Sequence, residues 1–291
     1  MTFLRRLIVV LSAVLLIAAC GSDPEPPRPP DQAAGQVYVN LGDSYASGTG
    51  VLPLQEGSPF LCFRSQHNFA RIVAERTGRA LTDVSCAGAT TDNMTTAQYD
   101  GVPPQLDALS DRTELVTMML GGNDNGTFGR SISVCGDVGR LVPKGSPCTD
   151  GPGAELLDPI EKRTYPALVD ALRSIREHAP RARVLIVGYP WIMPPEKGCF
   201  PDIPIAVEDV PLLREIQTSL NAVVERAAKR TGVTFVDMSR VSAGHDACKP
   251  ERVRWIEPQD NRSAAASLVG GLHPNAAGQR AIAEQVLAAL N

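Results

Sequence analysis

The hydrophobic positions of this chain fall into short aliphatic runs that alternate with longer amphipathic stretches. Each short run is rich in aliphatic or β-branched residues, and most are followed by a glycine or another turn residue, which is typical of a buried strand. This pattern predicts strands at 37–41, 81–85, 115–120, 184–187 and 233–236.

Amphipathic helices are predicted between these runs because apolar residues recur there at helical spacing. The predicted helices cover 67–77, 168–175 and 213–227, with a last one after Pro274. Strands that alternate with helices predict an α/β fold with a parallel sheet covered on both faces. Three stretches without periodicity are predicted to be loops above the carboxyl ends of the strands: 125–157, 190–210 and 238–272.

The first residues have the features of a bacterial secretory signal. Arg5 and Arg6 precede the apolar stretch 7–19, and two alanines come directly before Cys20. The sequence ending at Cys20 resembles a lipobox, which predicts a signal peptide at 1–19 and a diacylglycerol attached to the Cys20 thiol. An ordinary cleaved signal and an uncleaved anchor are the alternatives. We expect an exported protein, lipid-anchored at the outer face of the cell membrane or secreted.

The segment that follows has a different composition from the rest of the chain. Residues 20–36 are rich in proline and lack large apolar side chains, so we expect an extended tether, followed by one domain over 37–291. Hydrophobic residues make up 43% of the whole chain, which is ordinary for a globular protein. The formal net charge of -4 argues against a nucleic-acid-binding protein.

Seven cysteines are consistent with export. Once Cys20 is assigned to the lipid, six remain, and an even number in an exported chain predicts disulfides, although many pairings are possible. Proximity in the sequence suggests Cys62–Cys86, Cys135–Cys148 and Cys199–Cys248. A metal site is a weak alternative because the chain has no CxxC or CxH spacing, and we expect neither a metal nor an organic cofactor.

Four short blocks near predicted strand ends carry residues that suit nucleophilic catalysis. Ser44 follows the first strand in a glycine-rich turn, where a base can reach its hydroxyl. Gly88 offers a free backbone N–H, and the side chain of Asn123 can donate to an oxyanion. His273 precedes the last helix and can accept a proton. Taken alone, each of the first three blocks also fits a turn or a helix cap.

Together, these blocks resemble the SGNH hydrolase superfamily, also called GDSL-like lipases and esterases. In that family a Ser, a Gly, an Asn and a His come from four blocks in this chain order, here Ser44, Gly88, Asn123 and His273. The blocks span 42–275, and the GDSYASG sequence with the six cysteines resembles the secreted actinobacterial branch in particular.

The resemblance implies a flavodoxin-like three-layer α/β/α sandwich and a serine hydrolase mechanism. Ser44 would attack an ester carbonyl while His273 accepts its proton. The oxyanion would be held by the backbone N–H groups of Ser44 and Gly88 and by the side chain of Asn123. The counterparts of Asp43 and Asp124 are expected to be structural. We expect an ester or lipid substrate and a monomeric protein.

One position departs from the pattern of the family. Many members carry an aspartate three residues before the catalytic histidine, where this chain has Gly270. We expect the Gly270 carbonyl, or one nearby, to accept the proton of the His273 Nδ1 atom, which gives a Ser–His dyad. The alternative is a carboxylate from elsewhere, such as Asp237 or Asp246.

The best interpretation is an exported, lipid-anchored esterase or lipase. Four large side chains in the predicted loops are equally suited to line an acyl groove or to pack the loops: Trp191, Met193, Phe200 and Trp255. The alternatives are a cell-wall carbohydrate acetylesterase, a thioesterase, and a non-catalytic envelope-binding lipoprotein on a hydrolase scaffold.

Overall fold

The computed structural model of the protein describes residues 37–259 and 271–291. The expected signal peptide, Cys20 and the tether lie outside the described residues. The centre of the fold is a parallel sheet in the order β2-β1-β3-β4-β5. Its strands are Val37–Gly42 (β1), Ala80–Asp83 (β2), Thr113–Met119 (β3), Arg183–Val187 (β4) and Thr234–Val236 (β5).

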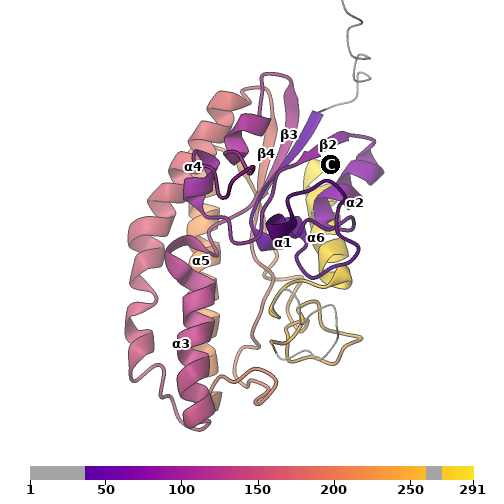
Figure 1. Ribbon diagram of the computed structural model, residues 1–291. Coiled ribbons are helices and arrows are strands. Elements are labelled where there is room, and N and C mark those ends of the chain that lie inside the picture. The colour runs from indigo at the N-terminus through magenta and orange to yellow at the C-terminus, as the bar shows by residue number, and fades with distance from the viewer. Residues whose placement is uncertain (1–36, 260–270) are drawn as a thin grey trace, which may run out of the picture. The chain divides into compact units, whose positions relative to one another are not determined.

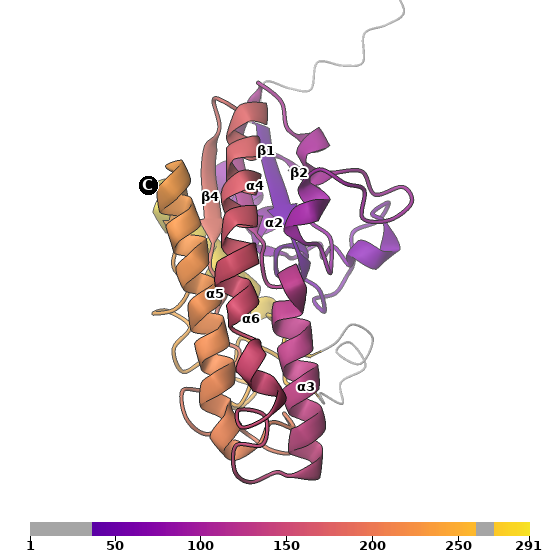
Figure 2. The same cartoon turned by 90° about the vertical axis from the view of Figure 1, so that its left-hand side faces the viewer.

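Helices cover both faces of this sheet, so the expected three-layer α/β/α architecture is confirmed (Figure 1). One face carries α2 (Phe69–Thr77) and α6 (Ala276–Leu290), which pack against each other. The other carries α4 (Tyr165–His178) and α5 (Val210–Thr231), which lie in front of the sheet in Figure 2. None of the helices in the described ranges has the length and apolar character needed to cross a bilayer.

The sheet topology brings distant parts of the chain together at one edge. Strand β1 pairs with β2 on one side and β3 on the other, and Gly42 lies opposite Met119 at the end of that second pairing. The connections from β1 and β3 therefore leave the sheet side by side and in opposite directions. Ligand sites of parallel sheets form at such a switch point, beyond the carboxyl ends of the strands.

One expectation was wrong, because the stretch 125–157 is not a loop throughout. It contains helix α3 (Thr127–Leu141), which packs against α5. Three glycines give α3 a low intrinsic helix propensity. Its buried face lacks the large aliphatic side chains that mark the other helices and consists of small residues: Thr127, Ser131, Cys135, Gly136 and Gly139. Gly139 is in close contact with the chain around Pro204, where an added Cβ would lie 2.2 Å from the Pro204 carbonyl oxygen.

Three disulfides fasten the segments around the carboxyl edge of the sheet. They join Cys62 to Cys86, Cys135 to Cys148 and Cys199 to Cys248, as proximity in the sequence suggested. Three disulfides would be unusual in a protein of a reducing compartment, so this pattern fits an exported protein.

Candidate active site

Ser44 is the first residue of the short helix α1 (Ser44–Ser47), directly after β1. Asp43 caps this helix, and its carboxylate accepts the Tyr45 N–H at 2.9 Å. Gly42 makes the sharp turn possible because its φ is +126° and a Cβ there would lie 2.1 Å from the Met119 carbonyl oxygen. The turn places the Ser44 side chain at the edge of the sheet, where it lines a cavity.

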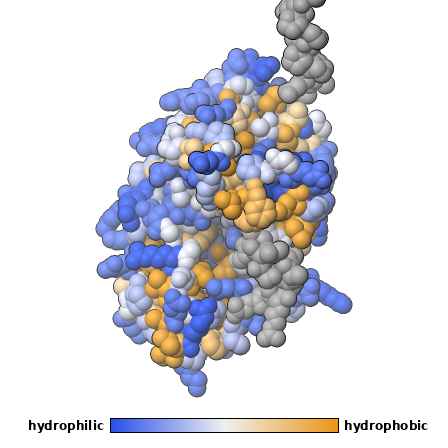
Figure 3. Space-filling view, in the orientation of Figure 1, coloured by the Kyte–Doolittle hydropathy of each residue, from blue (hydrophilic) through white to orange (hydrophobic). Residues whose placement is uncertain are grey.

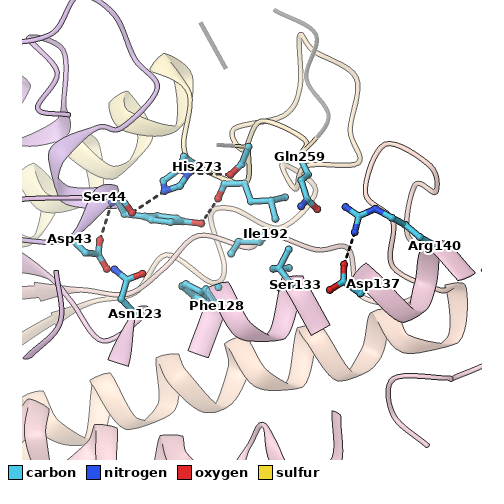
Figure 4. A pocket seen from close by; sticks show the side chains of 15 residues that line it. Asp43, Ser44, Asn123, Phe128, Ser133, Asp137, Arg140, Ile192, Gln259 and His273 are labelled. Carbon is cyan, nitrogen blue, oxygen red and sulfur yellow. Dashed lines mark hydrogen bonds and ion pairs between the residues drawn. The ribbon is translucent and has the colours of Figure 1, made fainter. Parts of the chain in front are cut away.

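The imidazole of His273 lies next to this hydroxyl although the two residues are 229 positions apart (Figure 4). Its Nε2 atom is 2.8 Å from the Oγ atom of Ser44. If Nε2 accepts the hydroxyl proton, Nδ1 must carry the hydrogen of the neutral ring. The geometry is therefore that of a nucleophile with its general base.

A backbone carbonyl accepts the other side of the imidazole. The His273 Nδ1 atom lies 3.1 Å from the Gly271 carbonyl oxygen, while the expected partner, Gly270, lies outside the described residues. Asp237 and Asp246 are both described, and each carboxylate accepts an N–H two residues further along the chain. Among the described contacts neither carboxylate bonds to His273.

The backbone around His273 is fixed from two sides. Leu272 donates its N–H to the Glu257 carbonyl at 2.7 Å, and the Glu257 N–H donates to the His273 carbonyl at 3.0 Å. The Tyr45 hydroxyl donates to the Leu272 carbonyl at 2.5 Å. Leu272 has a φ of +66°, a strained conformation for a branched residue, which these bonds hold in place. Tyr45 thereby links the nucleophile turn to the histidine.

The donors expected to hold an oxyanion lie on three segments that each follow a strand: Ser44 after β1, Gly88 after β2 and Asn123 after β3. Within 37–259 and 271–291, no hydrogen bond joins the backbone N–H of Ser44 or of Gly88 to a protein acceptor. The Asn123 Nδ2 atom donates to the Ala89 carbonyl at 3.0 Å, which uses one of its two hydrogens. This bond fixes the Asn123 amide beside Ser44 (Figure 4).

Asp43 is buried, and it ties the nucleophile turn to the connection after β4. The Tyr189 hydroxyl donates to its Oδ2 atom at 2.5 Å and accepts the Gly122 N–H at 2.9 Å. Burial raises the pKa of Asp43 from its ordinary 3.8 to about 7, although bonds from Tyr189 and Tyr45 favour the charged form. Asp43 thus holds backbone and hydroxyl groups.

Asp124 has a similar role on the neighbouring turn. Its carboxylate accepts the backbone N–H of Thr91 at 3.2 Å and a short hydrogen bond from the Thr91 hydroxyl. Burial raises the pKa of Asp124 as well. Because Asn123 and Asp124 bond to the segment that follows Gly88, the two oxyanion blocks form one connected unit.

A cavity of about 480 Å³ extends from Ser44 and His273 along α3. Its floor is apolar near the nucleophile, and its far end carries an ion pair between Asp137 and Arg140 at 3.0 Å (Figure 4). The apolar side chains of this trough are Tyr45, Phe128, Ile132, Ile192 and Leu272. Phe128 and Ile132 were missed as site residues because α3 was not predicted, although their i, i+4 spacing was a usable signal.

The four large side chains that suited either an acyl groove or loop packing are not among the residues that line this trough, although Ile192, next to Trp191, is. Trp191 packs under the guanidinium of Arg214 at 3.3 Å, and the Trp255 ring stacks on His245 at 4.0 Å. Loop packing therefore accounts for these two side chains. In the described part of the chain, no three His, Cys, Asp or Glu side chains are grouped to hold a metal ion.

Comparison with known proteins agrees with this geometry. The profile of the GDSL-like Lipase/Acylhydrolase family matches residues 41–281 of the chain, which include all four blocks. The protein belongs to this family. Its match to Lipase 2 of Streptomyces coelicolor is 48% identical and covers 98% of this chain and 96% of that one. Family membership makes the protein an ester-hydrolysing serine hydrolase.

Two solved structures share this fold. Phospholipase A1 from Streptomyces albidoflavus NA297 superimposes with a TM-score of 0.73 at 23% identity, over 88% of this chain and 99% of that one. The extracellular lipase from Streptomyces rimosus gives a TM-score of 0.72 at 24% identity, over 88% of this chain and 100% of that one.

Proposed function

We propose that this GDSL-like hydrolase is an exported lipase that cleaves acyl esters through a Ser44–His273 dyad. The observation that carries the proposal is the 2.8 Å contact between the Ser44 Oγ and His273 Nε2 atoms at the end of an apolar trough. A trough of this size accommodates an acyl chain, while the hydroxyl at its end meets the ester carbonyl.

The reaction proceeds in two halves. In the first, the Ser44 Oγ atom bonds to the ester carbonyl carbon as its proton passes to the Nε2 atom of His273. The carbonyl oxygen becomes an oxyanion that accepts the N–H groups of Ser44 and Gly88 and the second amide hydrogen of Asn123. The C–O bond then breaks, and the departing alcohol takes the proton from His273. In the second half, water attacks the acyl-enzyme with His273 as the base, and the acid and Ser44 are released.

In this scheme the Gly271 carbonyl takes the place of the aspartate that many members of the family carry three residues before the histidine, where this chain has Gly270. It accepts the Nδ1 hydrogen, which selects the tautomer whose Nε2 atom can accept a proton from Ser44. A carbonyl dipole stabilises the imidazolium less than a full negative charge does. Preorganised oxyanion donors are therefore a large part of the catalysis, at about 2.7–4 kcal/mol for each donor.

The proposal is tested by the hydrolysis of p-nitrophenyl butyrate. We expect Ser44→Ala and His273→Ala each to lower kcat/KM by at least ~10³-fold. Ser133→Ala is the matched control, because Ser133 lines the same cavity without a base, and we expect it to retain activity. Full activity of Ser44→Ala would refute the dyad. A preference for acetyl over longer acyl esters would refute the assignment of the trough to an acyl chain.

Export and anchoring are part of the same proposal. The disulfides and the N-terminal sequence support an exported protein, and the extracellular lipase of Streptomyces rimosus shares the fold. We propose a diacylglycerol on Cys20 and a monomeric domain on a tether. Mass spectrometry of the mature N-terminus tests this, because an unmodified N-terminus at any other residue contradicts the lipid anchor.

A further inference from the structure

Three large hydrophobic side chains are exposed together on the loop that follows the nucleophile helix. Leu52, Phe60 and Leu61 expose 54%, 73% and 51% of their surface. We call these three residues the apolar patch. Figure 3 shows hydrophobic side chains gathered over this loop, which lies between α1 and α2 on the face seen in Figure 1. Exposed apolar patches of this kind mark interaction sites.

The loop that presents the patch is built rigidly. The Cys62–Cys86 disulfide closes it, and an isolated β-bridge pairs Leu54 with Ser65. Phe63 has a φ of +47°, and its ring lies 5.3 Å from that of Phe60. A strained aromatic residue that persists in a cross-linked loop is held there by its surroundings. The backbone on both sides of the patch residues Phe60 and Leu61 is therefore held in place.

The patch is also attached directly to the catalytic blocks. The Ser65 N–H donates to the Ser47 carbonyl at 2.7 Å, which ties the loop to the helix that begins at Ser44. The Ala87 N–H donates to the Cys62 carbonyl at 3.2 Å, immediately before Gly88. The loop that carries the patch is therefore bonded to the segments that carry the nucleophile and the expected oxyanion donors.

The chemistry of the loop indicates which surface this is. Between Gly48 and Ser65 the charged residues are Glu56 and Arg64, and Arg64 is largely buried with its Nε atom bonded to the Ser85 carbonyl. The loop therefore presents no exposed cation to anionic headgroups. It also lacks the Trp and Tyr residues that are enriched at the headgroup level of membranes. Phe and Leu side chains without polar ends suit an oil phase, and the substrates of the family are esters.

We propose that the apolar patch docks the enzyme on droplets of neutral, water-insoluble ester and thereby brings the catalytic edge to its substrate. This inference rests on the proposed lipase function, because the docked phase is the substrate itself. Burial of a large apolar side chain is worth about a tenfold gain in affinity or more, so two such residues are enough for a measurable contribution.

Binding is measured separately from catalysis by flotation of Ser44→Ala protein with triolein droplets. In that background, we expect Phe60→Gln with Leu61→Gln to weaken droplet binding about tenfold or more. Leu141→Gln with Val142→Gln is the matched control, because these residues are 83% and 50% exposed at the far end of α3. We expect the control to bind within about twofold of its parent.

Kinetics of the enzyme with Ser44 intact separate a docking defect from a folding defect. The Phe60→Gln, Leu61→Gln enzyme is expected to hydrolyse soluble p-nitrophenyl acetate at the unaltered rate and emulsified triolein about tenfold more slowly. If Ser44→Ala retained its esterase activity, the proposed function would fail while droplet binding remained measurable.

Several results would overturn the docking proposal. They are unchanged droplet binding by the patch variant, an equal loss in the Leu141 and Val142 control, and no droplet binding by the parent. Tighter binding to phosphatidylcholine vesicles than to droplets would assign the patch to a membrane instead. Self-association in sedimentation that the patch variant abolishes would assign it to a second copy of the chain.

Discussion

The Nδ1 atom of His273 faces the Gly271 carbonyl, and Tyr45 connects the backbone before His273 to the nucleophile helix. Its hydroxyl bonds to the Leu272 carbonyl, and its ring centroid lies 5.3 Å from that of His273. Because Leu272 adopts a left-handed conformation, loss of this bond allows the backbone before His273 to relax. Tyr45 is thus a positioning residue for the dyad.

We expect Tyr45→Phe to lower kcat about tenfold while KM changes less than about twofold, because orientation of the base affects the transition state more than binding. Steady-state kinetics on p-nitrophenyl butyrate provide the measurement. Tyr38→Phe is the control, since Tyr38 is also fully buried and its hydroxyl bonds to Thr117 at 2.6 Å in the sheet. An equal fall in kcat for both variants would mean that the loss of any buried tyrosine hydroxyl lowers kcat, which would contradict a positioning role for Tyr45.

The buried carboxyl of Asp43 predicts a pH dependence of stability. Its pKa is about 7 in the folded protein against an ordinary 3.8, so the folded state holds the proton more tightly than the unfolded chain. The contribution of this group to the free energy of unfolding is therefore full below about pH 4 and is lost as the pH rises to about 7. The slope is at most about 1.4 kcal/mol for each pH unit.

Urea denaturation of the wild type and of Asp43→Asn between pH 4 and 8 tests this linkage. We expect the stability of the wild type relative to the variant to decline with rising pH across that window. Subtracting the variant removes the contributions of other carboxyl groups, including Asp124, whose pKa is raised in the same direction. If the difference in stability between the wild type and the variant is constant with pH, or grows as the pH rises, the raised pKa of Asp43 is contradicted.

Helix α3 forms one wall of the trough, and its close packing predicts opposite effects for two of its glycines. A Cβ on Gly139 meets the Pro204 carbonyl oxygen, whereas nothing lies within 4 Å of a Cβ on Gly129. We expect Gly139→Ala to destabilise the protein by about 2–4 kcal/mol through overpacking. Gly129→Ala should stabilise it by about 0.5–1 kcal/mol because alanine is the better helix former. Thermal unfolding followed by circular dichroism measures both, and equal effects would contradict this packing.

The contrast between α3 and the other helices explains how far the sequence could predict the fold. Helix α5 was predicted because Leu213, Ile216 and Leu220 repeat at helical spacing on a buried face. Helix α3 buries cysteine, serine and glycine instead, and two of its large apolar residues, Phe128 and Ile132, line the trough. Helix α3 is therefore harder to recognise from its sequence, because few large aliphatic residues mark its buried face and three glycines lower its helix propensity.

The candidate catalytic residues were predictable for a related reason. Ser44, Gly88 and Asn123 follow strands, so sequence position alone places them at the carboxyl edge of a parallel sheet. The groups that orient His273 were not predictable in the same way. A bond from the Tyr45 hydroxyl to the Leu272 carbonyl joins positions 227 apart and involves a backbone atom, which leaves no signal in residue type.

All the described strands, the disulfides and the proposed catalytic residues lie in the compact unit Gly35–Asn291. We therefore expect a protein that lacks residues 1–34 to fold with its three disulfides formed. Its melting temperature should lie within about 2 °C of that of the full chain, and its kcat/KM on soluble esters should be unaltered. A large loss of either in the truncated protein would mean that the N-terminal segment contributes to the domain.

The dyad is tested most directly by covalent labelling followed by peptide mapping. Treatment of the enzyme with a fluorophosphonate should add one phosphonyl group, found on the peptide that contains Ser44. Labelling should be at least ~10³-fold slower in His273→Ala, because the base no longer accepts the proton, and unchanged in Asp237→Asn and Asp246→Asn. A label on any other residue, or a rate in His273→Ala equal to that of the wild type, would contradict the account.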